Sequence, residues 1–139
     1  MRDVVFLTTP DLIDRHWQAA AALLAPVVDQ AARGEFTLED LGQMVREVCA
    51  VAGVMLQDGV PTLAMVFEFR HYPRKTVINI IALGGSDLTG CAMSFWPSFV
   101  AWAKESGAQE IEACTAPAMT RVLRGLGFIH TYDIVRLPC

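Results

Sequence analysis

The feature that most constrains this chain is the segment TVINIIAL at residues 76–83, which is almost entirely apolar. Strands covered by helices on both faces have near-continuous apolar sequences of this kind. Two further β-like segments, residues 51–57 and 62–69, come before it. Asp58-Gly59 separates them and is a typical hairpin pair, because such turns require positive φ angles. The sequence therefore predicts consecutive hairpin-linked strands that end in a buried central strand.

Helical patterns flank these strands. The first spans residues 10–34, and Pro26 within it should kink the helix or divide it into two. A second helix opens at Thr37, whose spacing to Asp40 is close to that of a capping box. Two more helices are expected at residues 88–106 and 118–126, each followed by a glycine.

Short strands are expected at residues 4–7, 110–114 and 128–137. The predicted order is β-α-α-β-β-β-α-β-α-β. This order indicates a mixed α/β class, with a central, mostly antiparallel sheet and helices on both faces. The chain has no repeats, low-complexity segments or long linkers, so we expect a single domain over residues 1–139.

Composition excludes several classes of protein. Hydrophobic residues make up 53% of the chain and charged residues 19%, which excludes a disordered chain. The longest apolar run, residues 19–28, is much shorter than the about 20 residues of a membrane span. The net charge of −4 argues against nucleic acid or anionic membrane as a partner and leaves room only for a local anion site. The start Met1-Arg2-Asp3 lacks the character of a signal peptide, so a cytoplasmic location is expected.

The cysteines and histidines are too scattered for a metal site, since zinc ligands gather at short spacings. No metal is therefore expected. Cys49 and Cys114 lie in apolar segments and are expected to be small buried residues, whereas Cys139 is expected to be a surface thiol.

Two segments carry a resemblance to a known family. The first is the central strand, glycine-containing turn and long helix at residues 78–103, and the second is the ending RVLRGLGF at residues 121–128. With the element order, they resemble the GNAT superfamily of acyl-CoA-dependent N-acetyltransferases. Residues 34–40 (GEFTLED), Tyr72-Pro73-Arg74 and the same ending are similar to small GNAT-like proteins of phages and prophages. The resemblance implies the GNAT fold, with acetyl-CoA or coenzyme A as cofactor, and the host cytoplasm if a phage encodes the chain.

The resemblance places cofactor binding at the turn after the central strand, namely at Leu83, Gly84, Gly85 and Ser86. A helix N-terminus there would bind the cofactor pyrophosphate. However, the turn lacks the family's leading Arg or Gln and its second small residue. It therefore also fits a tight strand-to-helix turn in which Ser86 or Asp87 caps the helix.

The short helix carries Arg121 and Arg124, which lie where the resemblance places the cofactor 3′-phosphate. Arginine side chains suit phosphate. A solvated helix face explains the same two residues.

Candidate catalytic residues are Glu68 and Tyr132. Glu68 interrupts an apolar strand and could take a proton from an amine, although an outward-facing carboxylate fits the alternation equally well. The family's tyrosine acid is replaced by Leu123, which has no ionisable proton. Tyr132 is the nearest alternative phenol, and a strand residue with a solvated hydroxyl is its other interpretation.

These departures lead to two hypotheses. The first is a GNAT-fold protein with a degenerate acetyl-CoA site and a binding or assembly role, as a homo-oligomer or with a phage protein partner. The second is an active N-acetyltransferase, because direct attack of an amine on a thioester depends mainly on orientation and an oxyanion donor. The family resemblance by itself does not choose between them.

Overall fold

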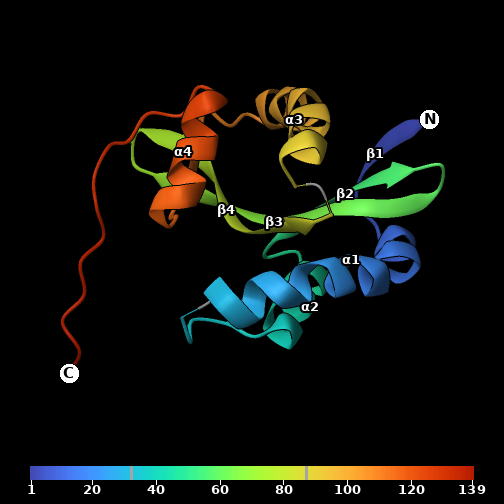
Figure 1. Cartoon of the computed structure of the whole chain (residues 1–139), viewed down its shortest axis with the longest axis horizontal. Coiled ribbons are helices and arrows are strands. Elements are labelled where there is room, and N and C mark those ends of the chain that lie inside the picture. Colours follow the sequence, from blue (N-terminus) through green and yellow to red (C-terminus); the bar gives the residue numbers. More distant parts are fainter. Residues whose placement is uncertain (32, 87) are drawn as a thin grey trace.

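The computed structural model describes residues 1–31, 33–86 and 88–139. Its elements follow one another in the expected order up to the last helix (Figure 1). They are β1 (Arg2–Phe6), α1 (Pro10–Ala31), α2 (Leu38–Arg46), β2 (Val51–Gln57), β3 (Val60–Tyr72), β4 (Lys75–Gly85), α3 (Leu88–Glu105), β5 (Glu110–Ala113) and α4 (Pro117–Gly125).

The five strands form one sheet in the order β1-β2-β3-β4-β5. Neighbouring strands are antiparallel except β4 and β5, which are parallel. Asp58 and Gly59 both have positive φ angles, 52° and 81°, which confirms the predicted hairpin between β2 and β3. The predicted α/β class with a mixed, mostly antiparallel sheet is thus confirmed.

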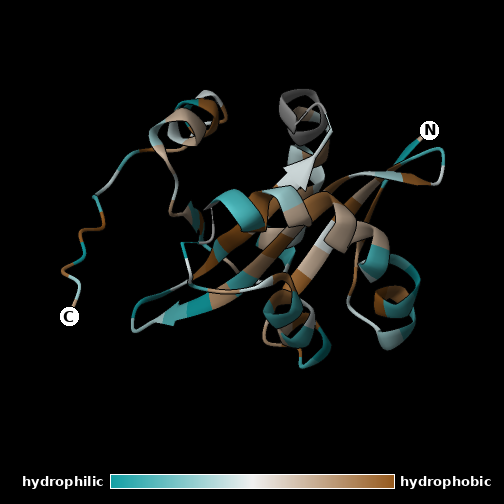
Figure 2. Ribbon diagram, turned by 60° about the horizontal axis from the view of Figure 1, so that its bottom comes forward, coloured by the Kyte–Doolittle hydropathy of each residue, from teal (hydrophilic) through white to brown (hydrophobic). Residues whose placement is uncertain are grey.

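Helices cover both faces of this sheet (Figure 1). On one face α1 and α2 pack against Val54, Val66 and Ala82 through a buried cluster that includes Trp17 and Leu24. On the other face α3 packs through buried aromatic and aliphatic side chains, namely Phe95 and Phe99 against Met65, Phe67 and Ile78. Hydrophobic colours accordingly run along the middle of the central strands (Figure 2). The sheet is the middle of three layers.

The helix signals are confirmed with one difference. Thr37 caps α2, and the reciprocal bonds with Asp40 form the predicted capping box. Pro26, however, does not divide the first helix, because α1 continues through it to Ala31. Pro26 and Ala22 are both exposed, so water can solvate the Ala22 carbonyl that loses its helical donor.

The predicted last strand is wrong. Residues 128–139 form neither strand nor helix, and in Figure 1 they extend from α4 away from the sheet. Phe128 packs on Trp96 of α3, with ring centroids 5.4 Å apart, and Arg136 forms an ion pair with Glu35. Apolar alternation is a local property, whereas a strand also needs a partner for its backbone groups, and this segment does not run along one.

The cysteine prediction is also wrong in part. Cys49 and Cys114 are exposed, because they follow the ends of α2 and β5, where the chain turns away from the core. Cys139 is exposed as expected. Within the described part of the chain, no helix combines the length and apolar character that crossing a membrane requires.

Candidate functional site

A bulge in β4 marks the part of the sheet where a ligand could bind. Val66 lies opposite Ala82 and Phe67 lies opposite Ile80, so Ile81 has no opposite residue on β3. Bulges of this kind disrupt the local ladder and are over-represented next to active sites.

β4 and β5 part at this same bulge. Their pairing runs from Val77 and Glu110 to Ile80 and Ala113, while β4 continues to Gly85. Beyond Ile80, the backbone groups of β4 on the β5 side lie outside this ladder. An extended ligand that carries amide groups can pair with a strand edge of this type.

A polar cluster lies directly before the parting point. Glu68, Asn79 and Glu112 are opposite one another on β3, β4 and β5 and share one face of the sheet. It is the face of α1 and α2, because Ala64 and Val66, four and two residues before Glu68, pack in the α1 and α2 cluster. Asn79 is only 6% exposed, and its Nδ2 donates a hydrogen bond to Glu68 Oε2 at 2.9 Å.

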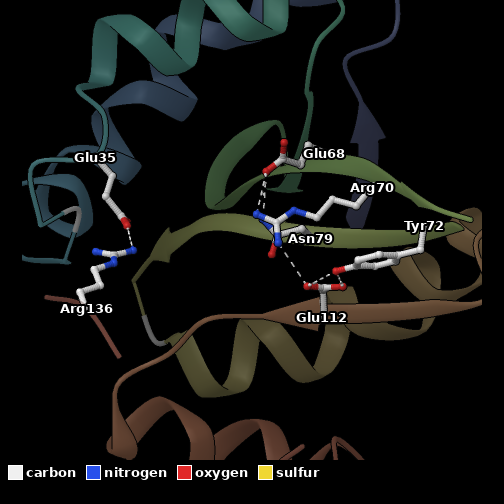
Figure 3. A network of polar contacts seen from close by, with 7 residues as sticks. All are labelled: Glu35, Glu68, Arg70, Tyr72, Asn79, Glu112 and Arg136. Carbon is white, nitrogen blue, oxygen red and sulfur yellow. Dashed lines mark hydrogen bonds and ion pairs between the residues drawn. The ribbon is translucent and has the colours of Figure 1, made fainter. Parts of the chain in front are cut away.

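Arg70 and Tyr72 complete the cluster from β3 (Figure 3). The Arg70 guanidinium lies between the two carboxylates, with Nη1 3.4 Å from Glu112 Oε2 and Nη2 3.8 Å from Glu68 Oε2. Tyr72 Oη donates to Glu112 Oε1 at 3.0 Å. The cluster therefore holds two carboxylates and one guanidinium, a net charge of −1 when all three are ionised.

These contacts shift two pKa values. Partial burial lowers the pKa of Arg70, but its interaction with Tyr72 and the charges of Glu68 and Glu112 outweigh burial and raise that pKa above the ordinary value. The hydrogen bond to Glu112 raises the pKa of Tyr72, because it favours the protonated phenol. Both groups keep their neutral-pH protonation states.

The structure brings only one of the two predicted catalytic residues into this cluster. Glu68 belongs to it and is about three-quarters buried, with a side-chain exposure of 28%. Tyr132 lies in the C-terminal segment and is 71% exposed. It is not on a strand, because the strand predicted for it does not form.

The turn predicted to bind cofactor ends β4. Leu83 packs with the α3 cluster, and Ser86 forms the turn before α3. A Cβ atom on Gly84 would lie 2.5 Å from the Leu23 carbonyl oxygen of α1, and one on Gly85 would overlap the Thr62 carbonyl of β3. Both glycines are thus required for close backbone packing, whatever else the turn binds. Asp87, the other predicted cap, lies outside the described residues.

Arg121 and Arg124 are both exposed on α4. Their spacing of three residues places them on one face of that helix. Neither takes part in an ion pair within the described residues. In both Figure 1 and Figure 2, α4 lies to one side of α3 and apart from the end of β4. The structure therefore places the predicted phosphate-binding residues in two separate groups.

Sequence reasoning missed Asn79, Glu112 and the role of Arg70. One signal was present, because Asn79 is the only side chain with an amide or charge in residues 76–83. A lone amide in a buried strand needs hydrogen-bond partners. Glu112 gave no such signal, since its place beside Asn79 depends on the pairing of strands more than 30 residues apart.

A metal ion has no evident site in residues 1–31, 33–86 and 88–139. No three or more His, Cys, Asp or Glu side chains there gather as a metal ion would require. In the polar cluster, Arg70 already occupies the position between the two carboxylates.

Comparison with solved structures decides the fold. An aminoglycoside N-acetyltransferase in complex with CoA superposes with a TM-score of 0.74, covering 100% of this chain and 95% of that chain at 16% identity. The fold is that of the GNAT acetyltransferases. A probable acetyltransferase matches with a TM-score of 0.75 at 14% identity, covering 99% of this chain and 97% of its own length. A GCN5-related N-acetyltransferase from Ralstonia eutropha matches with a TM-score of 0.73 at 13% identity over 99% of both chains.

Identities this low establish the GNAT fold and not the reaction. No protein-family model matches the chain, and a search of curated proteins found no match.

Proposed function

We propose that this protein binds acetyl-CoA along the free part of β4 and transfers the acetyl group to an amine. The observation that carries the proposal is the parting of β4 from β5 after Ile80, directly beside the cluster of Glu68, Asn79 and Glu112. A solved structure with the same fold was determined in complex with CoA, which supports the choice of cofactor.

The described residues fit such a cofactor at its amide-containing arm. Residues 81–85 offer backbone groups on the side that β5 leaves, and the bulge at Ile81 redirects those groups. When bound, acetyl-CoA supplies a thioester, whose C–S bond breaks as the new C–N bond forms. Leu83, Gly84, Gly85 and Ser86, with Arg121 and Arg124, are the proposed contacts to its phosphates.

Glu68 is the proposed general base. Its carboxylate accepts a hydrogen bond from Asn79 and lies 3.8 Å from Arg70, and these contacts hold the group in place to accept a proton. The proton released when the amine bonds to the acetyl carbon would pass to Glu68 directly or through water. Tyr132 remains the candidate acid for the leaving thiolate, which Tyr132→Phe tests through a fall in kcat without a change in KM for the amine.

Calorimetric titration with acetyl-CoA and free coenzyme A tests the first half of the proposal. We expect a dissociation constant in the micromolar range, and a thermal-shift series should show stabilisation of about 2.7 kcal/mol at 100 times that constant. A thiol-release assay against a panel of primary amines tests transfer. Absence of binding at millimolar cofactor would overturn the proposal.

A second candidate function is assembly without catalysis, and the C-terminal segment favours it. Its apolar side chains are exposed, including Val135 at 90% and Leu137 at 88%. Several exposed apolar side chains gathered in one segment are typical of a surface that another chain covers. The likeness to phage-encoded proteins stays a prediction, as does a phage protein partner.

Light scattering on the full chain and on a chain truncated after Phe128 tests this second candidate. Truncation there keeps the contact with Trp96 and removes the exposed residues. We expect the full chain to be a homo-oligomer and the truncated chain to be a monomer. A monomeric full chain that turns over acetyl-CoA would exclude the assembly role.

A further inference from the structure

A hollow of about 400 Å³ lies where α1 ends and α2 begins, and none of the polar cluster on the sheet lines it. Its apolar wall is made by four half-buried side chains, Ala25, Val28, Phe36 and Leu38. Val28, Phe36 and Leu38 also pack against the buried α1 and α2 cluster, so the wall is continuous with the core. The hollow is large enough for an aliphatic side chain, since a cavity of about 150 Å³ holds a benzene molecule.

Charged side chains stand at the rim of this hollow. Asp29 and Arg33 line it, and Glu35 lies between the lining residues Gly34 and Phe36. Two carboxylates and one guanidinium give the rim an excess of negative charge when all three are ionised. A basic group is therefore attracted to this rim more strongly than an acidic one.

The C-terminal segment brings such a basic group to the rim. Arg136 forms an ion pair with Glu35, and Figure 3 shows the two side chains pointing toward each other. In Figure 1 the segment runs from α4 down to the level of α1 and α2. Leu137 follows directly, with its Cα about 3.8 Å from that of Arg136. It is 88% exposed, so an aliphatic side chain that the protein does not cover comes next to the residue held at the apolar hollow.

Leu137 is exposed because of its place in an extended segment. Successive side chains of extended backbone point in opposite directions, so Arg136 faces Glu35 and Leu137 faces solvent. Among the described residues, no backbone hydrogen bond involves Arg136 or Leu137. A rotation of the backbone between these two residues therefore turns the leucine toward the protein without breaking a backbone hydrogen bond.

We propose that the hollow between α1 and α2 is a docking site for Leu137 of the same chain, with the ion pair between Arg136 and Glu35 as its anchor. The occupant belongs to the same chain because the anchor forms within one chain, which gives the tethered leucine a high effective concentration. Docking fastens the C-terminal segment to the connection between α1 and α2. It leaves Ile129 and Val135 exposed for a second chain, and it does not depend on acetyl-CoA.

Methyl NMR of the full chain, labelled at its leucine and valine methyl groups, tests this docking. We expect nuclear Overhauser effects from the Leu137 methyls to those of Val28 and Leu38. Leu137→Ser should shift the Val28 and Leu38 methyl resonances. Val135→Ser is the matched control and should leave them unchanged, because Val135 is 90% exposed and lies on the same side of the segment as Leu137.

A charge reversal tests the anchor. Arg136→Gln should weaken docking about two- to fivefold, which is the range for loss of an exposed ion pair. Glu35→Arg should weaken it as well, since two guanidinium groups then repel each other. Combining Glu35→Arg with Arg136→Glu should restore the Overhauser effects, which a general loss of stability at either position would not do.

Absence of the Overhauser effects in the unaltered chain, or unchanged Val28 and Leu38 resonances in Leu137→Ser, would overturn the docking. A mixture of labelled and unlabelled chains distinguishes contacts within one chain from contacts between two. Overhauser effects that arise only between two chains would overturn docking within one chain. Failure of the proposed acetyl transfer would be seen in the calorimeter and would leave these NMR signals as they are.

Discussion

Gly84→Ala is expected to destabilise the protein through backbone packing alone. The added methyl carbon would lie 2.5 Å from the Leu23 carbonyl oxygen and 3.1 Å from Val27 Cγ2. The first of these contacts is with main chain, so no side-chain rotation can relieve it, and α1 must move away from β4. Moving that helix disturbs the buried cluster that includes Leu24 and Ala82.

The magnitude follows from two opposing effects. Overpacking in a tight core costs about 1–3 kcal/mol, and a contact with rigid backbone belongs in the upper part of that range. Replacing glycine by alanine also reduces the freedom of the unfolded chain, which offsets about 0.5–1 kcal/mol. The net loss in the free energy of unfolding should be about 1–2.5 kcal/mol, or roughly 4–10 °C in Tm for a chain of this size.

Urea unfolding followed by circular dichroism measures this loss, and Gly125→Ala is the matched control. A Cβ on Gly125 would meet nothing within 4 Å, and the residue ends the helix α4. Alanine there should be neutral or stabilising by up to about 1 kcal/mol. If Gly84→Ala were as stable as the unaltered chain, the close approach of α1 to β4 would not be the reason for glycine at this position.

Three further predictions concern stability. Thr37→Ala removes the cap whose oxygen accepts from the Asp40 amide, and should cost about 1 kcal/mol in urea unfolding. Phe99→Ala empties a fully buried ring position and should cost about 3–5 kcal/mol in the same measurement. The hydrogen bond to Glu112 raises the pKa of Tyr72 above 10.0, so its stabilisation is complete below that pH and is lost as pH rises through the folded-state pKa. The free energies of unfolding of Tyr72→Phe and of the unaltered chain should therefore differ at neutral pH and become equal in alkali. A difference that grows with pH would contradict a stabilising hydrogen bond from Tyr72 to Glu112.

Much of the fold could be predicted because its signals are local. Alternation and a two-residue turn defined β2 and β3, and the spacing of Thr37 and Asp40 defined the start of α2. The final strand could not be predicted correctly, since the apolar residues after Phe128 alternate whether or not a partner strand lies beside them. The alternating pattern is present there without strand pairing, so alternation alone does not establish a strand.

The candidate site, like the fold, could be predicted from the sequence only in part. Glu68 was found from the sequence because it interrupts an apolar alternation. Asn79 and Glu112 were not, since each becomes meaningful only when the strands pair in one register. A shift of one residue would turn Asn79 to the α3 face and remove it from the cluster.

The sequence by itself determined the kinds and the order of the elements as far as α4, and the burial of the central strand, because periodicity, turns and caps act over a few residues. Only the tertiary structure decided where β4 parts from β5, which face carries the charged residues, and that Asn79 retains an unsatisfied oxygen there. These features depend on contacts between residues 11 to 42 positions apart in the chain, as in the pairs Glu68–Asn79 and Arg70–Glu112. Local propensity does not specify such contacts; packing of the complete sheet against its helices does.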